Sequence, residues 1–309
     1  MKKNNKKKLI IVLCSLVLIT GCTTTLKTED KKVVKNPETG QSLTANILCK
    51  PTNKETIKAY EENGVDLAAI PKCSEFKITS GGYEGLWTSI FVKPLAFIIL
   101  FINNYLKSAA ISLIITSIAL RLVLYPVTKK TAMQSELIKK AKPDLDKLEK
   151  KYANKTDQDS LMKKSQEMTM IYKKYNINPI SGCLFSFLQL PLFIAFLEAI
   201  NRVPSLFEGT FLTLQLGTTP SVGLFNNGHF VYVILIVLVG LTTYFSFNLN
   251  KTTATATKDL MANMTNVMTG MITVMAIFMP TALCIYWITT NVFTIVQNVI
   301  VKRDKEVTV

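Results

Sequence analysis

An apolar run that contains one positive charge constrains the fold of this chain most. Residues 108–128 read SAAISLIITSIALRLVLYPVT, lie between Lys107 and Lys129, and include Arg121. As an α-helix this segment is roughly 31 Å long, which is enough to cross the hydrocarbon core of a bilayer. A guanidinium in that medium costs from about 2.5 to more than about 10 kcal/mol, depending on the method of estimation. The fold must therefore provide a special environment for Arg121.

Two environments suit a charge at this position. Arg121 lies eight residues before Lys129, about 12 Å along a helix axis, so its long side chain can extend toward cytoplasmic headgroups. Alternatively, the guanidinium faces a hydrated cavity inside a bundle of helices, as intramembrane charges usually do. The span alone leaves both arrangements open.

The composition indicates an all-α polytopic membrane protein. Apolar residues make up 49% of the 309 residues, mean hydropathy is +0.28, and several long apolar runs follow the first. The net charge of +15 lies mostly beside these runs, which is typical of cytoplasmic loops that face anionic lipid. Ribosomal RNA is a second possible partner for this charge.

The N-terminus resembles that of a bacterial lipoprotein. Residues 1–21 combine a lysine-rich head with a short apolar stretch that ends in L-I-T-G before Cys22. We expect cleavage of this signal peptide and a lipid on the Cys22 sulfur, with the mature N-terminus outside the cell. The alternative is an uncleaved anchor with an incidental cysteine.

Residues 22–85 form a polar extracytoplasmic segment that we expect to be loosely structured. Cys49 and Cys73 lie in it, and either a disulfide or two free thiols suits an exported segment. Residues 86–107 follow, in which the uninterrupted apolar stretch 94–102 is too short for a span. We expect an amphipathic helix at the outer membrane interface.

Five transmembrane helices are expected within residues 108–303. After the first span at 108–128, the others cover approximately 179–200, 229–248, 261–279 and 281–301, and residues 304–309 form a cytoplasmic tail. An outside start places every basic loop and the C-terminus in the cytoplasm, as the positive-inside rule requires.

Residues 129–178 between the first two spans carry thirteen lysines against seven acids. Two apolar stripes at helical spacing, separated by a short polar turn, predict an antiparallel helical hairpin in the cytoplasm. One stripe contains Leu137, Ala141, Leu145, Leu148 and Tyr152, and the other contains Leu161, Ser165, Met168, Tyr172 and Tyr175. The charges are either a solvated face or a docking surface for substrate or ribosome.

Polar side chains follow one face of three expected spans. On the fifth span they are Trp287, Thr290, Asn291, Thr294, Gln297 and Asn298; on the first, Ser117, Arg121, Tyr125 and Thr128; on the second, Ser186 and Gln189. Such faces are either polar contacts between helices or the wall of a hydrophilic groove. A single groove explains three polar faces and a buried arginine together.

Three stretches resemble the signature sequences of the YidC family of membrane-protein insertases. They are ALRLVLYPVTKK (residues 119–130), NINPISGCLFSFLQLPLFIAF (176–196) and PTALCIYWITTNVFTIVQ (280–297), and the lipoprotein N-terminus is similar to that of the family's Gram-positive branch. The resemblance implies a five-span insertase with a groove open to cytoplasm and lipid, and a hairpin that recruits substrate. It matches Arg121, Gln189 and Trp287 to groove positions, to which the polar faces add Ser117, Asn291 and Thr294. Phe185 and Ala282 stand where Pro and Gly are usual in the family.

The expected activity is insertion of nascent membrane proteins at the bacterial plasma membrane, without covalent chemistry. A single His excludes zinc-protease spacing, the chain has no GxxxxGK loop, and no paired acids occur in the spans, so neither an enzyme nor a cofactor is expected. A secondary transporter is the alternative, although no inverted repeat is visible. Expected partners are nascent membrane proteins and lipid, with no small-molecule substrate, and the Sec translocon and ribosome stay open.

Overall fold

The computed structural model describes residues 23–155, 157–178, 180–226, 228–249 and 258–306, and within these the side chains of all but 180–188, 258–264 and 304–306. The expected signal peptide and Cys22 therefore lie outside the described residues. The chain divides into two compact units, which are considered separately. The first comprises Leu190–Ile236, Ala276–Tyr286 and the described part of Met1–Ser117; the second comprises Ile118–Gln189, Val237–Met275 and Trp287–Val309.

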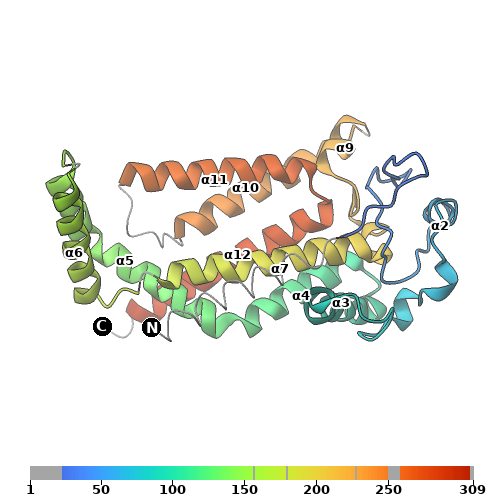
Figure 1. Cartoon of the computed structure of the whole chain (residues 1–309), viewed down its shortest axis with the longest axis horizontal. Helices are drawn as coiled ribbons and strands as arrows, with labels where there is room; N and C mark the ends of the chain where they lie inside the picture. The colour runs from blue at the N-terminus through green and yellow to red at the C-terminus, as the bar shows by residue number, and fades with distance from the viewer. Residues whose placement is uncertain (1–22, 156, 179, 227, 250–257, 307–309) are drawn as a thin grey trace. The chain divides into compact units, whose positions relative to one another are not determined.

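Most of the described chain is helical, as expected (Figure 1). The helices are α2 (Lys54–Glu61), α3 (Lys93–Leu106), α4 (Ala109–Val123), α5 (Tyr125–Tyr152), α6 (Gln158–Lys174), α7 (Ile180–Arg202), α8 (Pro204–Phe207), α9 (Pro220–Phe225), α10 (Val231–Leu249), α11 (Lys258–Phe278) and α12 (Thr281–Glu306). Two short strands, β1 (Thr210–Phe211) and β2 (Leu214–Gln215), pair antiparallel.

Among the described residues, three helical segments are long and apolar enough to cross a membrane: Thr88–Leu106, Val231–Leu249 and Thr281–Arg303. The bent pair α4 and α5 makes a fourth candidate if it counts as one span. These segments agree with a helical membrane protein, and the count of five spans stays a prediction.

The first expected span, residues 108–128, is not one straight helix. Helix α4 ends at Val123, and α5 begins at Tyr125 with an axis bent by 70°. Pro126 explains the break, because it has no N–H to donate to the carbonyl of Leu122 and its ring crowds that carbonyl. Tyr125 therefore does not extend the polar face that carries Arg121, contrary to expectation.

Residues 86–107 contain one continuous helix, as expected. A π-helical turn, Thr88–Val92, continues into α3, so the helix Thr88–Leu106 has nineteen residues. Lys93 interrupts the apolar sequence but is only 1% exposed, because its ammonium donates to the carbonyls of Ser80 and Gly82 and lies 3.4 Å from Glu84. By length and composition this helix can span a bilayer. Its length therefore does not favour a position at the interface over a transmembrane one. The interfacial position stays a prediction.

The polar segment before it is packed rather than loosely structured, which corrects the expectation. Leu26, Leu43, Ile47 and Tyr60 form a buried cluster with Phe207, the last residue of α8. Hydrogen bonds join the same regions, since Leu48 N donates to the carbonyl of Arg202 at 2.8 Å. We call residues 23–81 the cap. The apolar residues of the cap are scattered along its sequence and do not by themselves indicate a core. The core becomes visible only in the structure, where Phe207 of α8 completes it.

Within the second unit, α5 and α6 lie side by side in opposite directions (Figure 1). A small core of Ile138, Ala141, Tyr172 and Ile177 holds them together. Ion pairs Lys174–Asp144, Lys164–Glu149 and Lys151–Glu167 cross between them at 2.7, 3.0 and 2.6 Å. Asp157 caps α6 through a hydrogen bond from Ser160 N.

Candidate functional site

The centre of the expected groove is a hydrogen-bonded pair in the second unit. Arg121, near the end of α4, is 6% exposed, and its Nη2 donates to Oε1 of Gln189 on α7 at 2.6 Å. A charged donor and a neutral amide acceptor form a stronger bond than two neutral groups, and the guanidinium keeps its full charge. This burial favours an interior position for Arg121 over a side chain extended toward headgroups.

The expected polar face of α12 is also buried. Trp287 is half-buried, whereas Thr290, Asn291, Thr294, Gln297 and Asn298 are all at most 8% exposed. Asn291 donates from Nδ2 to Oγ1 of Thr243 on α10 at 2.9 Å. Thr294 donates instead to the carbonyl of Thr290 on its own helix. Asn291 therefore makes a polar contact between helices in addition to any groove role.

Two polar residues outside the expected site join it to neighbouring helices. The Gln297 side-chain amide donates to Oγ1 of Thr128 on α5 at 2.9 Å, and both residues are buried. Thr243, the partner of Asn291, is fully buried on α10. The α12 periodicity identified Gln297, but no pattern in the strongly apolar α10 identified Thr243.

Ser117 lies one turn before Arg121 on α4 and belongs to the first unit. It is 1% exposed, and its hydroxyl donates to the carbonyl of Leu113 at 2.6 Å. Its hydrogen-bonding capacity as a donor is thus used within its own helix.

The first unit contains a buried ionic cluster around Arg202. Arg202 and Glu198, one turn apart on α7, form an ion pair at the longer distance of 4.0 Å. The guanidinium of Arg202, 1% exposed, makes its close ion pair with Glu84 and donates from Nε to the carbonyl of Asn46 at 2.7 Å. Glu198 accepts a hydrogen bond of 2.9 Å from the indole of Trp87. This cluster, which includes Lys93, ties the cap to α7 and to the Thr88–Leu106 helix.

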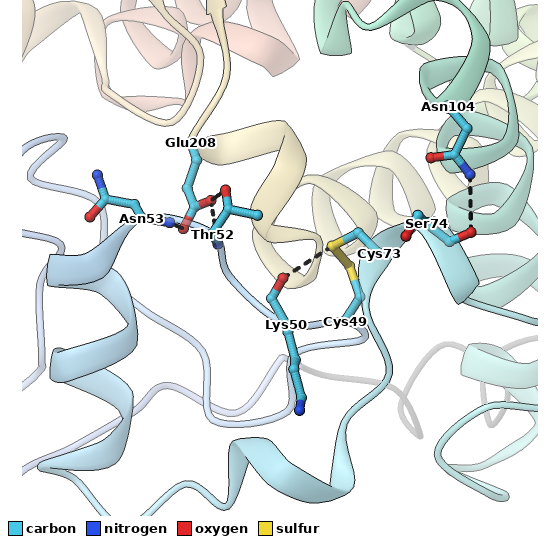
Figure 2. Close-up of a disulfide and its surroundings, with 8 residues drawn as sticks. All are labelled: Cys49, Lys50, Thr52, Asn53, Cys73, Ser74, Asn104 and Glu208. Carbon is cyan, nitrogen blue, oxygen red and sulfur yellow. Dashed lines mark hydrogen bonds between the residues drawn. A yellow bond between two sulfur atoms is a disulfide. The ribbon is translucent and has the colours of Figure 1, made fainter.

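Figure 2 shows a disulfide between Cys49 and Cys73 in the cap, with Cα atoms 4.8 Å apart. On one side of it, the carboxylate of Glu208 accepts hydrogen bonds from the N–H and hydroxyl of Thr52 (3.0 and 2.7 Å). On the other side, Asn104 of α3 donates to the carbonyl of Ser74 at 3.2 Å. The segment closed by the disulfide is thus attached at both ends to the rest of the first unit.

The α5–α6 pair presents a shallow hollow of about 460 Å³, lined by Asp144, Lys147, Leu148, Lys151, Glu167, Met170, Ile171 and Lys174. Two carboxylates in it are paired. The pKa of Asp144 is lowered because Lys174 and Tyr175 donate hydrogen bonds to it. The pKa of Glu167 is lowered in the same way by Lys151 and Tyr152.

The chain is similar to a family of known membrane proteins. The profile of the family described as 60Kd inner membrane protein matches residues 101–308. The membrane protein insertase YidC of Oceanobacillus iheyensis is 32% identical over 227 residues, 71% of this chain and 85% of the relative. Membrane protein insertase YidC 2 of Bacillus anthracis is 32% identical over 219 residues, which cover 71% and 82%. Membrane protein insertase MisCA of Bacillus subtilis is 31% identical over 70% and 79%.

A crystal structure of an active YidC insertase with its first transmembrane domain resolved aligns with 78% of this chain and 52% of that one. Its sequence identity is 20% and its TM-score is 0.47, so no conclusion about the fold rests on it.

Proposed function

Since the chain belongs to the YidC family of membrane-protein insertases, matched by the 60Kd inner membrane protein profile, we propose that it inserts nascent proteins into the cell membrane. The family membership carries this proposal, and the buried Arg121–Gln189 pair gives it a chemical centre. The comparisons give no support to a secondary transporter.

The proposed mechanism uses the positive charge of Arg121 as a transient binding site. A short polar tail of the nascent protein, often acidic, enters a hydrophilic groove lined by Arg121, Ser117, Gln189, Trp287, Asn291 and Thr294. Coulomb attraction is strong where water is scarce, so the guanidinium competes well with bulk water for a carboxylate. The apolar segment of the substrate then moves sideways into lipid.

Burial of this apolar segment supplies the driving force. At about 25 cal/mol per Å² of apolar area, a whole span gains far more than the transient interactions of its tail. No covalent step is needed, and no cofactor enters the mechanism. The paired amide of Gln189 suits the role, because it holds the guanidinium in place without neutralising it.

The finer assignments belong to the same proposal. They comprise five spans, an interfacial helix at 86–107, a cytoplasmic hairpin at 129–178 that recruits substrate, and a cytoplasmic C-terminus. Processing before Cys22 and its lipidation anchor the N-terminus outside the bacterial plasma membrane. Mass spectrometry of the purified protein would refute the anchor if it found an intact Met1 or an unmodified Cys22. The basic hairpin is proposed as a docking surface for substrate or ribosome, and cooperation with the Sec translocon stays open.

Reconstitution tests the function directly. Proteoliposomes that contain only this chain should protect the outer tail of a single-span substrate from added protease, and liposomes without it should not. Solute uptake by the same proteoliposomes without substrate protection would replace the insertase by the transporter.

A further inference from the structure

The loop between α7 and α10 combines two properties that are unusual in a water-exposed segment. Residues 209–231 contain no Lys, Arg, Asp or Glu, although charged residues make up 18% of the chain. Three large apolar side chains in this loop are nevertheless strongly exposed: Leu212 at 85%, Phe225 at 77% and Phe230 at 79%. All lie in the first unit. Such a surface is unfavourable in water and suits an apolar environment.

Leu212 also has a backbone conformation that disfavours leucine. It lies at the turn between β1 and β2 with φ of +55°, in the left-handed region where Gly and Asn are the usual residues. An exposed leucine thus occupies a position where a smaller or polar residue would relieve strain. Burial of the leucine side chain in an apolar environment would offset this strain.

The loop is held at the ends of two membrane-length helices. Thr281 and Ala282, the first residues of α12, donate backbone hydrogen bonds of 2.8 and 2.9 Å to the carbonyls of Thr218 and Leu216. In the first turn of α10, the hydroxyl of Tyr232 accepts a 3.1 Å bond from Gln215 N. By length and composition, Val231–Leu249 and Thr281–Arg303 can each span a bilayer. A loop held at the first residues of two such spans would lie at the depth of the membrane boundary.

Tyr232 also fixes the position of α9. Its ring covers Gly223 so closely that a Cβ added there would lie 2.1 Å from a ring carbon. A glycine is therefore required, and α9 cannot move away from the start of α10 without breaking this contact. Phe225 at the end of α9 and Phe230 just before α10 are consequently presented from a rigid base.

The cap makes polar contacts with the end of α7 and with the same loop. Gln41 donates from its side chain to Asn201 at 3.1 Å, and the Thr218 hydroxyl donates to the carbonyl of Thr39. The cap is rich in lysines and acids, whereas the exposed tip of the loop has none. This difference in charge is explained if the cap faces water and the tip of the loop faces lipid.

We propose that the tip of this loop, formed by Leu212, Phe225 and Phe230, inserts into the lipid leaflet at the boundary where α10 and α12 begin. The tip would contact lipid at the level between headgroups and acyl chains, where aromatic side chains are favoured. Because the loop lacks charge, the contact depends on apolar burial and is insensitive to salt and to anionic lipid. This contact does not depend on insertase activity.

A fluorescent label measures the environment of the tip. The full chain, with Cys14, Cys22, Cys183 and Cys284 replaced by Ala and the Cys49–Cys73 bridge kept, receives Leu212→Cys or Phe225→Cys and a nitrobenzoxadiazole label. Each variant is reconstituted into phosphatidylcholine vesicles. Quenching is measured with nitroxide-labelled lipid and with aqueous iodide. Lys58→Cys is the control, since its side chain is 74% exposed on α2 of the charged cap.

The proposal predicts blue-shifted emission at positions 212 and 225, quenching by lipid nitroxide, and weak quenching by iodide at low and high salt. The control should show the opposite pattern. Iodide quenching at both tip positions equal to that of the control would overturn the proposal, because the tip would then lie in water. Protection from both quenchers would also overturn it, because protein rather than lipid would then cover the tip.

Discussion

The guanidinium of Arg121 lies 2.6 Å from the side-chain oxygen of Gln189, and the pair is formed between α4 and α7 within one compact unit. An amide accepts this hydrogen bond without cancelling the charge, whereas a carboxylate would cancel it. Exchange of the amide for a carboxylate can therefore keep the contact between α4 and α7 while it removes the net positive charge of the pair.

Gln189→Glu should therefore impair insertion while keeping the helices together. A carboxylate at this position forms an ion pair with Arg121 in a medium of low dielectric, where opposite charges interact strongly. Substrates with acidic outer tails should insert poorly and those with neutral tails almost normally. Gln189→Met, of similar size, keeps the charge available and serves as the control in the same protease-protection assay. Equal insertion of acidic tails by the Glu variant and wild type would contradict the proposed role of the charge.

Arg202→Met should destabilise the first unit strongly. It removes one of the two cations paired with Glu84, the other being Lys93, and it leaves Glu198, only 5% exposed, without its nearest cation. Breaking a buried ion pair from one side costs about 3–5 kcal/mol, and the 28% exposure of the Glu84 side chain points to the lower end of that range.

Thermal unfolding in detergent should give a lower Tm for Arg202→Met, with partial recovery in the double variant Arg202→Met, Glu84→Gln. Arg303→Met changes an exposed arginine and should leave the Tm unchanged. A wild-type Tm in Arg202→Met would show that the cluster does not hold the cap.

Loss of the Cys49–Cys73 bridge should loosen the cap. The bridge closes a segment with a sequence separation of 24, for which chain entropy gives about 3.5 kcal/mol of stabilisation. In the double Ser variant, trypsin should cleave faster at Lys54 and Lys58, whereas cleavage between α5 and α6 should not change. In oxidised membranes the native cysteines should react with maleimide only after reduction. Labelling of both without reduction would mean that the bridge does not form in cells.

The contact between α5 and α6 should weaken at both extremes of pH. The pKa values of Asp144 and Glu167 are lowered by hydrogen bonds from Lys174 and Lys151, so their stabilisation is present above the unfolded pKa and is lost as acid protonates them. The pKa values of both lysines are raised by the same bonds. Their stabilisation is present below the unfolded pKa and is lost as pH rises through the folded one.

Amide hydrogen exchange in α6, corrected for the intrinsic rate, should consequently be slowest near neutral pH and faster below about pH 4. These pairs are exposed, so high salt should reduce the effect. Asp144→Asn should flatten the acidic limb. Protection that does not vary between pH 3 and 7 in wild type would show that apolar contacts alone hold α6.

The sequence predicted local features of the fold well, because helical periodicity is a local property. Ala141, Leu148 and Tyr152 are buried in the α5–α6 region as their spacing suggested. Leu161, on the same type of stripe in α6, is 52% exposed, which its spacing did not predict. We did not expect the break at Leu124, because the apolar sequence is continuous and indicated one helix, and Pro126 lies near the end of that sequence.

Contacts between distant residues were beyond sequence reasoning. Arg202 and Glu84 are 118 residues apart, so their close ion pair was not expected, whereas the pairing of Arg202 with Glu198 one turn away is a local one. The cap gave no apolar periodicity, because its core is completed by Phe207 from another part of the chain. By contrast, Gln189 and Arg121 were each singled out by their chemistry, since a polar side chain in an apolar helix has few acceptable environments.

Insertion by Arg121 variants is the most direct measurement of the central claim. Wild type, Arg121→Lys and Arg121→Ala are compared at equal membrane levels, with single-span substrates whose outer tails are acidic or neutral. The Lys variant should keep much of the activity, although it loses the forked donor geometry. The Ala variant should remain folded and should fail to insert substrates with acidic tails. Its insertion of substrates with neutral tails should be reduced less. Insertion of acidic tails by Arg121→Ala at the wild-type rate would contradict the groove mechanism.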